Sequence, residues 1–222
     1  ALHMSDLIMK LMDDEDPLVR LRIIKKLPLI AEQVPSLCTR LTEALKAMFT
    51  NSNWRVRKAL VEAMPAVVKF MGQEYFIDHF LSLSLLLVKD GVDEVRVAAS
   101  ASLADVAGVT DPNWVHEKIF PTFKTYAAEE YLIRVTMLSA FQNFLKIENL
   151  PERFRADAMA QLIQGTQDKV PNIRVRAAQI VQVLLNLPHL GDVRDQLQDS
   201  LTGLSTDKDK DVRYFATHAR TK

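Results

Sequence analysis

The side chains best suited to chemistry are scattered along the chain. Five histidines and one cysteine occur among 222 residues, and no two histidines have the i, i+4 spacing that places two metal ligands on one helix face. A single cysteine, Cys38, builds neither a cysteine-based zinc cluster nor an internal disulfide. The Gly-x-Ser-x-Gly, P-loop and dinucleotide-binding fingerprints are absent from the sequence. We therefore expect no metal, no cofactor and no catalytic centre, and we interpret Cys38 as a small buried side chain.

Charge and composition narrow the class of partner. The 28 lysines and arginines balance 28 aspartates and glutamates, whereas a nucleic-acid binder usually carries a basic surplus that displaces counterions from phosphates. The longest apolar stretch, Phe80 to Val88, contains serines and is too short to span a bilayer. We expect no nucleic-acid and no membrane partner. With no recognisable signal peptide, the cytoplasm is the expected compartment, and the nucleus is the alternative.

The strongest pattern in the sequence is a repeat. An apolar residue followed by arginine recurs six times, with 37 to 40 residues between successive arginines. The copies are Val19-Arg20, Val56-Arg57, Val95-Arg96, Ile133-Arg134, Ile173-Arg174 and Val212-Arg213. This period is close to that of HEAT repeats, in which each unit is a pair of helices.

Each unit has the pattern of two helices around a short turn. In the second unit, residues 35–50 form the first expected helix, Asn51 to Asn53 supply turn and cap chemistry, and apolar residues then follow at steps of three and four. No segment shows the period-two alternation of a strand. We predict an all-α, right-handed α-solenoid of about six HEAT repeats in a single array. The expected units are residues 5–34, 35–72, 73–110, 111–150, 151–190 and 191–222.

The two ends of the chain lack the polar caps that a solenoid needs. The first unit has apolar residues on more than one face, and only nine residues follow Arg213. The sequence is therefore interpreted as a fragment of a longer solenoid, with fraying expected in the first and last helices.

The repeated arginines lie early in the second helix of each unit and have two interpretations. A ladder of partly buried ion pairs between turns is favoured for Arg20, Arg57, Arg96, Arg174 and Arg213, with acceptors such as Asp16, Asp93, Asp168 and Asp211. A row of donors that face a partner is the alternative. Arg134 is the arginine best placed to serve both purposes.

Apolar residues at the tips of three turns favour a partner-binding ridge. Trp54 begins a helix but lies off its apolar face, and tryptophan is enriched among binding hot spots. Tyr131-Leu132 and Val170-Pro171 occupy the equivalent position in later turns. Local packing of these tips is the alternative. Trp114, by contrast, fits the core face of a first helix.

These motifs together resemble a known family. The segment from Asn53 to Pro65 (NWRVRKALVEAMP) is similar to a repeat of the scaffold (A, 65-kDa regulatory) subunits of type 2A protein phosphatases. So are the segments at residues 14–24, 72–76, 131–134 and 211–216, in the same order. The resemblance covers residues 6–219 and implies the last six repeats of that scaffold.

The resemblance implies a partner and a set of contacts. In that family the C-terminal repeats hold the phosphatase catalytic subunit through the turns within repeats, and earlier, N-terminal repeats hold the regulatory subunit. The matching residues here are Trp54, Arg55, Tyr131, Leu132, Arg134, Val170, Pro171 and Asn172. Asp93-Glu94 and Glu129-Glu130 depart from the family pattern, so no contact is carried over to Asp93-Glu94. Tubulin-binding HEAT arrays and nuclear-transport HEAT fragments are the alternative assignments.

Overall fold

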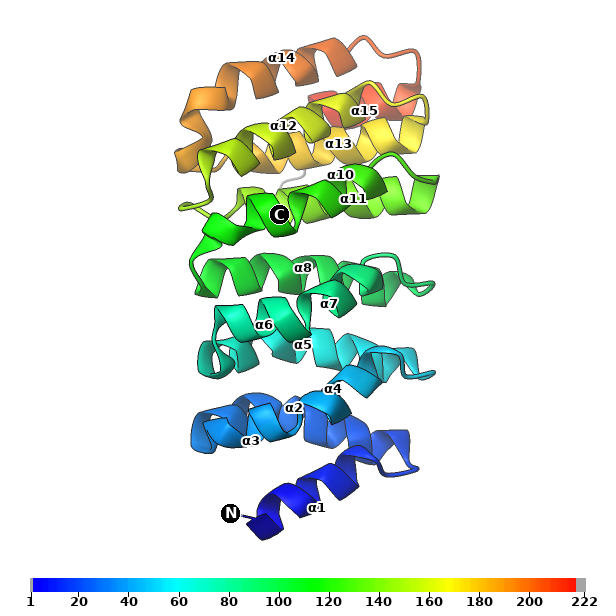
Figure 1. The fold of residues 1–222 in the computed structure, drawn as a ribbon. Helices are drawn as coiled ribbons and strands as arrows, with labels where there is room; N and C mark the ends of the chain where they lie inside the picture. Colours follow the sequence, from blue (N-terminus) through cyan, green and yellow to red (C-terminus); the bar gives the residue numbers. More distant parts are fainter. Residues whose placement is uncertain (1, 219–222) are drawn as a thin grey trace. The chain divides into compact units, whose positions relative to one another are not determined.

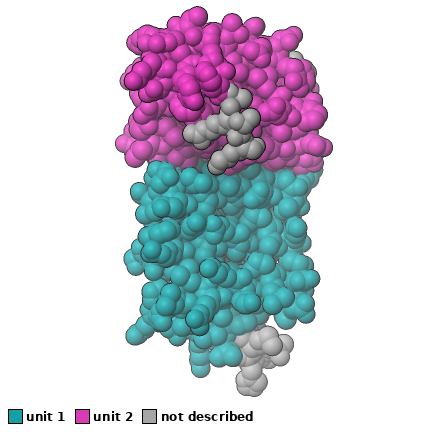
Figure 2. All heavy atoms as spheres, turned by 180° about the vertical axis from the view of Figure 1, so that it is seen from behind, with its two compact units in different colours: residues 1–111 teal, residues 112–222 magenta. Residues whose placement is uncertain are grey.

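The computed structural model describes residues 2–218, which form helices and turns and contain no strand. The ribbon in Figure 1 shows successive helices stacked in pairs. The chain divides into two compact units, residues 1–111 and 112–222, coloured separately in Figure 2.

Unit 1 contains two layers of helices. The second helix of each pair, α2, α5 or α8, packs against the next in one layer, and the first-helix segments lie in front of them in Figure 1. The helices are α1 (Leu2–Met12), α2 (Pro17–Gln33), α3 (Pro35–Arg40), α4 (Thr42–Phe49), α5 (Trp54–Met71), α6 (Gln73–His79), α7 (Leu81–Leu87) and α8 (Asp93–Val109).

Unit 2 repeats this arrangement, with α11, α13 and α15 as the layer of second helices. Its elements are the 3₁₀ turn η1 (Pro112–Trp114), α9 (Val115–Lys118), α10 (Phe120–Tyr126), α11 (Tyr131–Leu145), α12 (Glu152–Thr166), α13 (Pro171–Leu184), the 3₁₀ segment η2 (Pro188–Val193), α14 (Arg194–Leu204) and α15 (Lys210–Thr217). The predicted fold class, an all-α solenoid of helix pairs, is confirmed within each unit.

Several first helices are broken where the sequence predicts one continuous helix. The helix expected over residues 35–50 is divided at Leu41 into α3 and α4. In unit 2, α9 ends before Ile119 and α10 begins at Phe120. Pro121 accounts for this second break, because proline has no N–H to donate to the preceding helical turn. The second helices continue through their own prolines, Pro28 in α2 and Pro65 in α5.

The core follows the apolar periodicity of the second helices. In α5, the residues at steps of three and four, Val56, Leu60, Met64 and Val67, are all at most 1% exposed. Trp114 is 8% exposed, which confirms its prediction as a core residue. The side chain of Cys38 lies outside the described part of the structure. This packing presents the turn between the two helices of each pair at one edge of its unit.

Candidate functional site

Five of the six turns share one construction at their first residue. An aspartate or asparagine side chain accepts a hydrogen bond from the backbone N–H two residues later, at 2.8 to 2.9 Å. Such a bond folds the chain into a tight turn without glycine. The residues are Asp14, Asn51 and Asp90 in unit 1, and Asp168 and Asp207 in unit 2.

The repeated arginine closes the same turn from the other side. In five turns its Nη1 donates to the backbone carbonyl of the residue six positions earlier, at 2.6 to 2.9 Å. Arg134 instead donates to the Glu129 carbonyl, five positions earlier, at 2.9 Å. This bond gives the arginine a fixed position relative to the turn. Spacing alone did not predict it.

Three arginines also reach the carboxylate that begins the next turn. Each guanidinium donates through Nε and Nη2 to the two oxygens of one aspartate, the bidentate geometry of a strong charge-assisted pair. The pairs are Arg57–Asp90 at 2.7 and 2.8 Å, Arg134–Asp168 at 3.0 and 3.1 Å, and Arg174–Asp207 at 2.7 Å for both bonds. The side chains of these arginines are 7 to 17% exposed.

The acceptors are only partly those expected from the sequence. Asp168 accepts as expected, but Asp90 and Asp207 take the places assigned to Asp93 and Asp211. Asp93 lies inside α8 and pairs with Arg96 of the same helix at 2.7 Å. Asp90 and Asp207 are the acceptors because each is the first residue of its turn. A hydrogen bond from the backbone N–H two residues later holds its carboxylate at the boundary between repeats.

The same contacts shift the carboxyl pKa values. Hydrogen bonds from Arg174 lower the pKa of Asp207 against the opposing effect of burial. For Asp90, burial alone raises the pKa, but hydrogen bonds from Arg57 and the Val92 amide, with the charges of Arg57 and Arg96, hold it below its ordinary value. Both carboxyls therefore stay ionised at neutral pH and keep adjacent turns in register.

At the tip of the α4–α5 turn in unit 1, Trp54 and Arg55 form one surface element. Asn53 caps α5 by accepting a hydrogen bond from the Arg55 N–H at 3.0 Å. Trp54 is half-buried and Arg55 is exposed. The Arg55 guanidinium lies 4.5 Å from the centroid of the Trp54 ring, a cation–π contact. The tryptophan is thus less exposed than the sequence suggested, and the arginine beside it presents its charge to solvent.

The expected tips in unit 2 lie on two adjacent turns. Tyr131 and Leu132, at the start of α11, are 38% and 52% exposed. At the start of α13, Val170 and Pro171 are half-buried and Asn172 is exposed. The Arg134–Asp168 pair connects these two turns. The Arg134 guanidinium is bound to Asp168 and to the Glu129 carbonyl, which fixes its position between the two turns.

A cavity below these tips was missed by sequence reasoning. It has a volume of about 330 Å³, and the Arg134–Asp168 pair lies on its wall. Met137, Leu138 and Phe141 of α11 also line it, together with residues of α12 and α13, so no single segment reveals it. The one sequence signal is Gly165, where an added Cβ would come within 2.7 Å of a Leu138 methyl group.

Two kinds of feature are absent from the described residues. Within residues 2–218, no group of three or more His, Cys, Asp or Glu side chains is placed to hold a metal ion. In the same part of the chain, no helix is both long enough and apolar enough to cross a membrane.

Comparisons with known proteins find a distant similarity to one regulatory subunit of a phosphatase. No protein family model matches the chain. It is 24% identical over 176 residues to serine/threonine-protein phosphatase 4 regulatory subunit 1 of Rattus norvegicus and to that of Homo sapiens. The match covers 74% of this chain and 18% of each relative, so the chain spans about a fifth of their length.

Solved structures with a similar fold include a mutant of Kap121p, with a TM-score of 0.64 and 15% identity, over 96% of this chain and 25% of that one. An engineered protein gives a TM-score of 0.51 and 16% identity, over 96% and 93% of the two chains. At these identities the likeness shows the fold alone, which is that of a helical repeat protein.

Proposed function

We propose that the chain is a non-catalytic scaffold that binds the catalytic subunit of a type 2A serine/threonine protein phosphatase through the turns within its repeats. The observation that carries this proposal is the construction of the turns. Each of these turns is held by hydrogen bonds of its own side chains: a side-chain oxygen accepts from a backbone N–H, or an arginine donates to a backbone carbonyl. The apolar residues at the tips of the turns are exposed or half-buried. Trp54, Tyr131, Leu132, Val170 and Pro171 are these tip residues.

Fixed turns favour binding because they reduce its entropic cost. When a loop becomes ordered on binding, its loss of conformational entropy offsets part of the favourable free energy of the contacts. A turn that is already ordered before binding does not lose this entropy. The guanidinium–carboxylate pairs also hold neighbouring tips at a set spacing. A rigid partner surface can therefore contact Tyr131 and Leu132 together with Pro171 and Asn172 without either protein rearranging.

The scaffold's effect on a phosphatase is geometric. A catalytic subunit held on one part of a solenoid and a substrate adaptor held on another are kept at a raised effective concentration relative to each other. No new chemistry is needed from the scaffold. In this proposal all six turns belong to a single repeat array, and the regulatory subunit binds to other repeats on the N-terminal side.

Two sequence similarities support a phosphatase as partner. The turn motifs resemble those of type 2A scaffold subunits in the same order along the chain, and the curated relatives are named as a regulatory subunit of phosphatase 4. The two similarities point to related catalytic subunits. The choice between these subunits is therefore part of the experiment.

The test is a calorimetric titration of the folded chain with purified type 2A and phosphatase 4 catalytic subunits. We expect a one-to-one complex with at least one of them, and no binding to a type 1 catalytic subunit used as a control. Circular dichroism of the same sample establishes that the chain is helical. A helical chain that binds neither catalytic subunit would contradict the proposal.

A further inference from the structure

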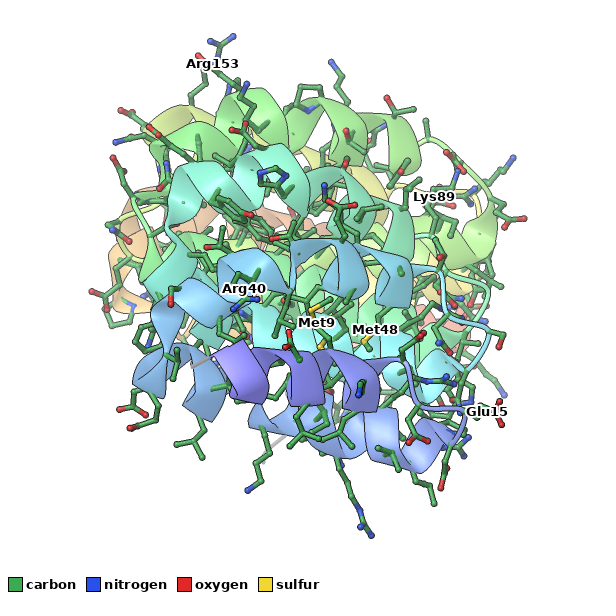
Figure 3. All side chains as sticks on the ribbon, turned by 60° about the horizontal axis from the view of Figure 1, so that its bottom comes forward. Met9, Glu15, Arg40, Met48, Lys89 and Arg153 are labelled. Carbon is green, nitrogen blue, oxygen red and sulfur yellow. The ribbon has the colours of Figure 1, made fainter. Side chains whose placement is uncertain are left out.

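A groove with a volume of about 520 Å³ lies between α5 and α8 in unit 1. All of its lining residues belong to these two helices. The first residue of α8, Asp93, lines one end of it, so the groove begins at the edge of the unit that carries the turns. Figure 3 shows that edge, with Glu15 of the α1–α2 turn and Lys89 of the α7–α8 turn on the same side.

A small residue of α8 accounts for the hollow. Ala101 lies five residues after Arg96, and the residues at the same distance from the repeated arginines of α5 and α2 are Glu62 and Lys25. The shorter side chain of Ala101 leaves space between α5 and α8. Val97, one turn earlier in α8, is 51% exposed and also lines the groove. The floor of the groove is therefore apolar and open to solvent, which is typical of a surface that contacts another chain.

The rim of the groove is acidic. Glu94 and Asp105 of α8 are exposed, and the side chain of Glu62 in α5 is 53% exposed. A basic residue of the lining, Lys58, pairs with Glu62 at 3.6 Å within α5. Asp93 pairs with a buried arginine of its own helix. Carboxylates thus outnumber cations along the lining, and those of Glu94 and Asp105 are accessible at its two ends.

The spacing of these carboxylates favours basic side chains over a metal ion. Glu94 and Asp105 lie about 16 Å apart along the axis of α8, at 1.5 Å per residue. Within residues 2–218, no group of three or more His, Cys, Asp or Glu side chains is placed to hold one metal ion. Each end of the groove is instead suited to attract a separate positive charge.

We infer that this groove binds an extended segment of a partner protein that carries two arginines with an apolar side chain between them. In an extended chain, alternate side chains point to the same side, and residues four positions apart are separated by about 13 Å. Long arginine side chains at these positions reach Glu94 and Asp105 and form charge-assisted hydrogen bonds. The apolar side chain between them contacts Val97 and Ala101. A helix about 10 Å across is too wide for the groove, because α5 and α8 pack directly against each other.

This groove is separate from the contacts proposed for the phosphatase. Neither Trp54 nor Arg55 lines it, and the other proposed contacts lie in unit 2. Glu94 is also one of the residues at which the sequence departs from the phosphatase scaffold pattern, and contact with a basic segment gives that departure a role. The groove therefore adds a second class of partner and does not rest on the proposed function.

The test uses the whole chain with alanine and valine methyl groups labelled for NMR. The probes are the capped peptide Arg-Ala-Val-Ala-Arg, its neutral counterpart Gln-Ala-Val-Ala-Gln, and Arg-Arg-Ala-Val-Ala, which has the same charge at another spacing. We expect the first peptide to shift the methyl signals of Val97 and Ala101. It should bind at least about tenfold more tightly than the neutral peptide and about threefold more tightly than the third.

Three results of this titration would overturn the inference. The first is equal binding of the first peptide and either of the other two. The second is the absence of a shift at Val97 and Ala101 with any peptide. The third is a shift of the same signals with protein concentration alone, which would show that a second copy of the chain occupies the groove.

Glu94→Gln combined with Asp105→Asn removes the charges at both ends of the groove. We expect this double variant to bind the first peptide at least about tenfold more weakly. Glu74→Gln combined with Asp78→Asn is the matched control, since it removes the same two charges from exposed positions of α6, in the layer of first helices. Its binding should be unchanged at physiological salt, where distant exposed charges are screened. An equal loss in the two double variants would show that the peptide responds only to the overall charge.

Ala101→Gln tests the shape of the groove without a change of charge. Glutamine fills the hollow, and α13 has Gln179 at the same distance from its repeated arginine, so a helix in this position accommodates it. We expect at least about fivefold weaker binding of the first peptide, and circular dichroism checks that the variant unfolds at the temperature of wild type. Full binding by the folded variant would show that the apolar floor is not the binding surface.

Discussion

Replacement of Arg174 by methionine is expected to lower the free energy of unfolding of the chain by about 3 kcal/mol. Arg174 is 6% exposed and donates to both oxygens of Asp207 and to the Asp168 carbonyl. Methionine fills much of the same space but leaves the Asp207 carboxylate, which is 12% exposed, without its cation. Loss of one member of a buried pair is costly because the remaining charge stays desolvated. Urea unfolding followed by circular dichroism measures the effect.

Arg213→Met is the matched control for this prediction. Arg213 holds the same position in the last turn, but it is exposed, and its hydrogen bonds among the described residues go to backbone carbonyls. Its replacement should have a much smaller effect than that of Arg174. Equal losses in the two variants would show that turn closure, and not the link between turns, supplies the stability.

The pH dependence gives an independent readout of the same pair. The pKa of Asp207 is lowered in the folded state from its ordinary value of 3.8. The pair therefore contributes its whole stabilisation at pH values above the ordinary pKa of 3.8. This contribution is lost as the pH falls through the lowered pKa of Asp207 in the folded state. The difference between wild type and Arg174→Met should shrink below about pH 4. A difference that stays constant down to pH 2 would mean that packing, not charge, causes the loss.

Replacement of Trp54 by alanine is expected to weaken binding to the phosphatase catalytic subunit by about 2 kcal/mol, a factor of about 30. Trp54 and the Arg55 guanidinium stacked against it form a tip that is held in place by the Asn53 cap. Aromatic residues at the centre of an interface commonly supply a large share of the binding free energy. Calorimetry of wild type and variant against the same catalytic subunit measures the change.

Phe70→Ala tests whether position on the turn is what matters. Phe70 is an aromatic residue near the opposite end of the same helix, α5, and is 39% exposed. It lies about 24 Å from Trp54 along the helix axis at 1.5 Å per residue. Binding should be unchanged in Phe70→Ala. If the two variants weaken binding equally, the interface does not lie on the turns.

The fold was predictable because its signals are local and repeated. The apolar steps from Val56 to Val67 in α5 and the arginine period define helix pairs without any knowledge of distant contacts, since repeats contact mainly their neighbours. The breaks at Leu41 and Ile119 were not predicted. At Ile119 the sequence carries a signal for the break in Pro121, two residues further along.

The site was less predictable because its contacts join residues more than thirty positions apart. The link from Arg174 to Asp207 spans 33 residues, and the choice of Asp207 over Asp211 depends on which carboxylate its own turn fixes. The partner contacts of Trp54, Arg55 and the tips of unit 2 stay predictions.

The most direct test of the scaffold proposal is hydrogen exchange of the chain with and without a bound phosphatase catalytic subunit. We expect the complex to slow amide exchange at the turns and helix starts of residues 50–56, 127–134 and 167–174. The opposite ends of the second helices, such as residues 66–72, should exchange at unchanged rates. Protection confined to those opposite ends, or unchanged exchange throughout a folded chain, would contradict a phosphatase scaffold that binds through its turns.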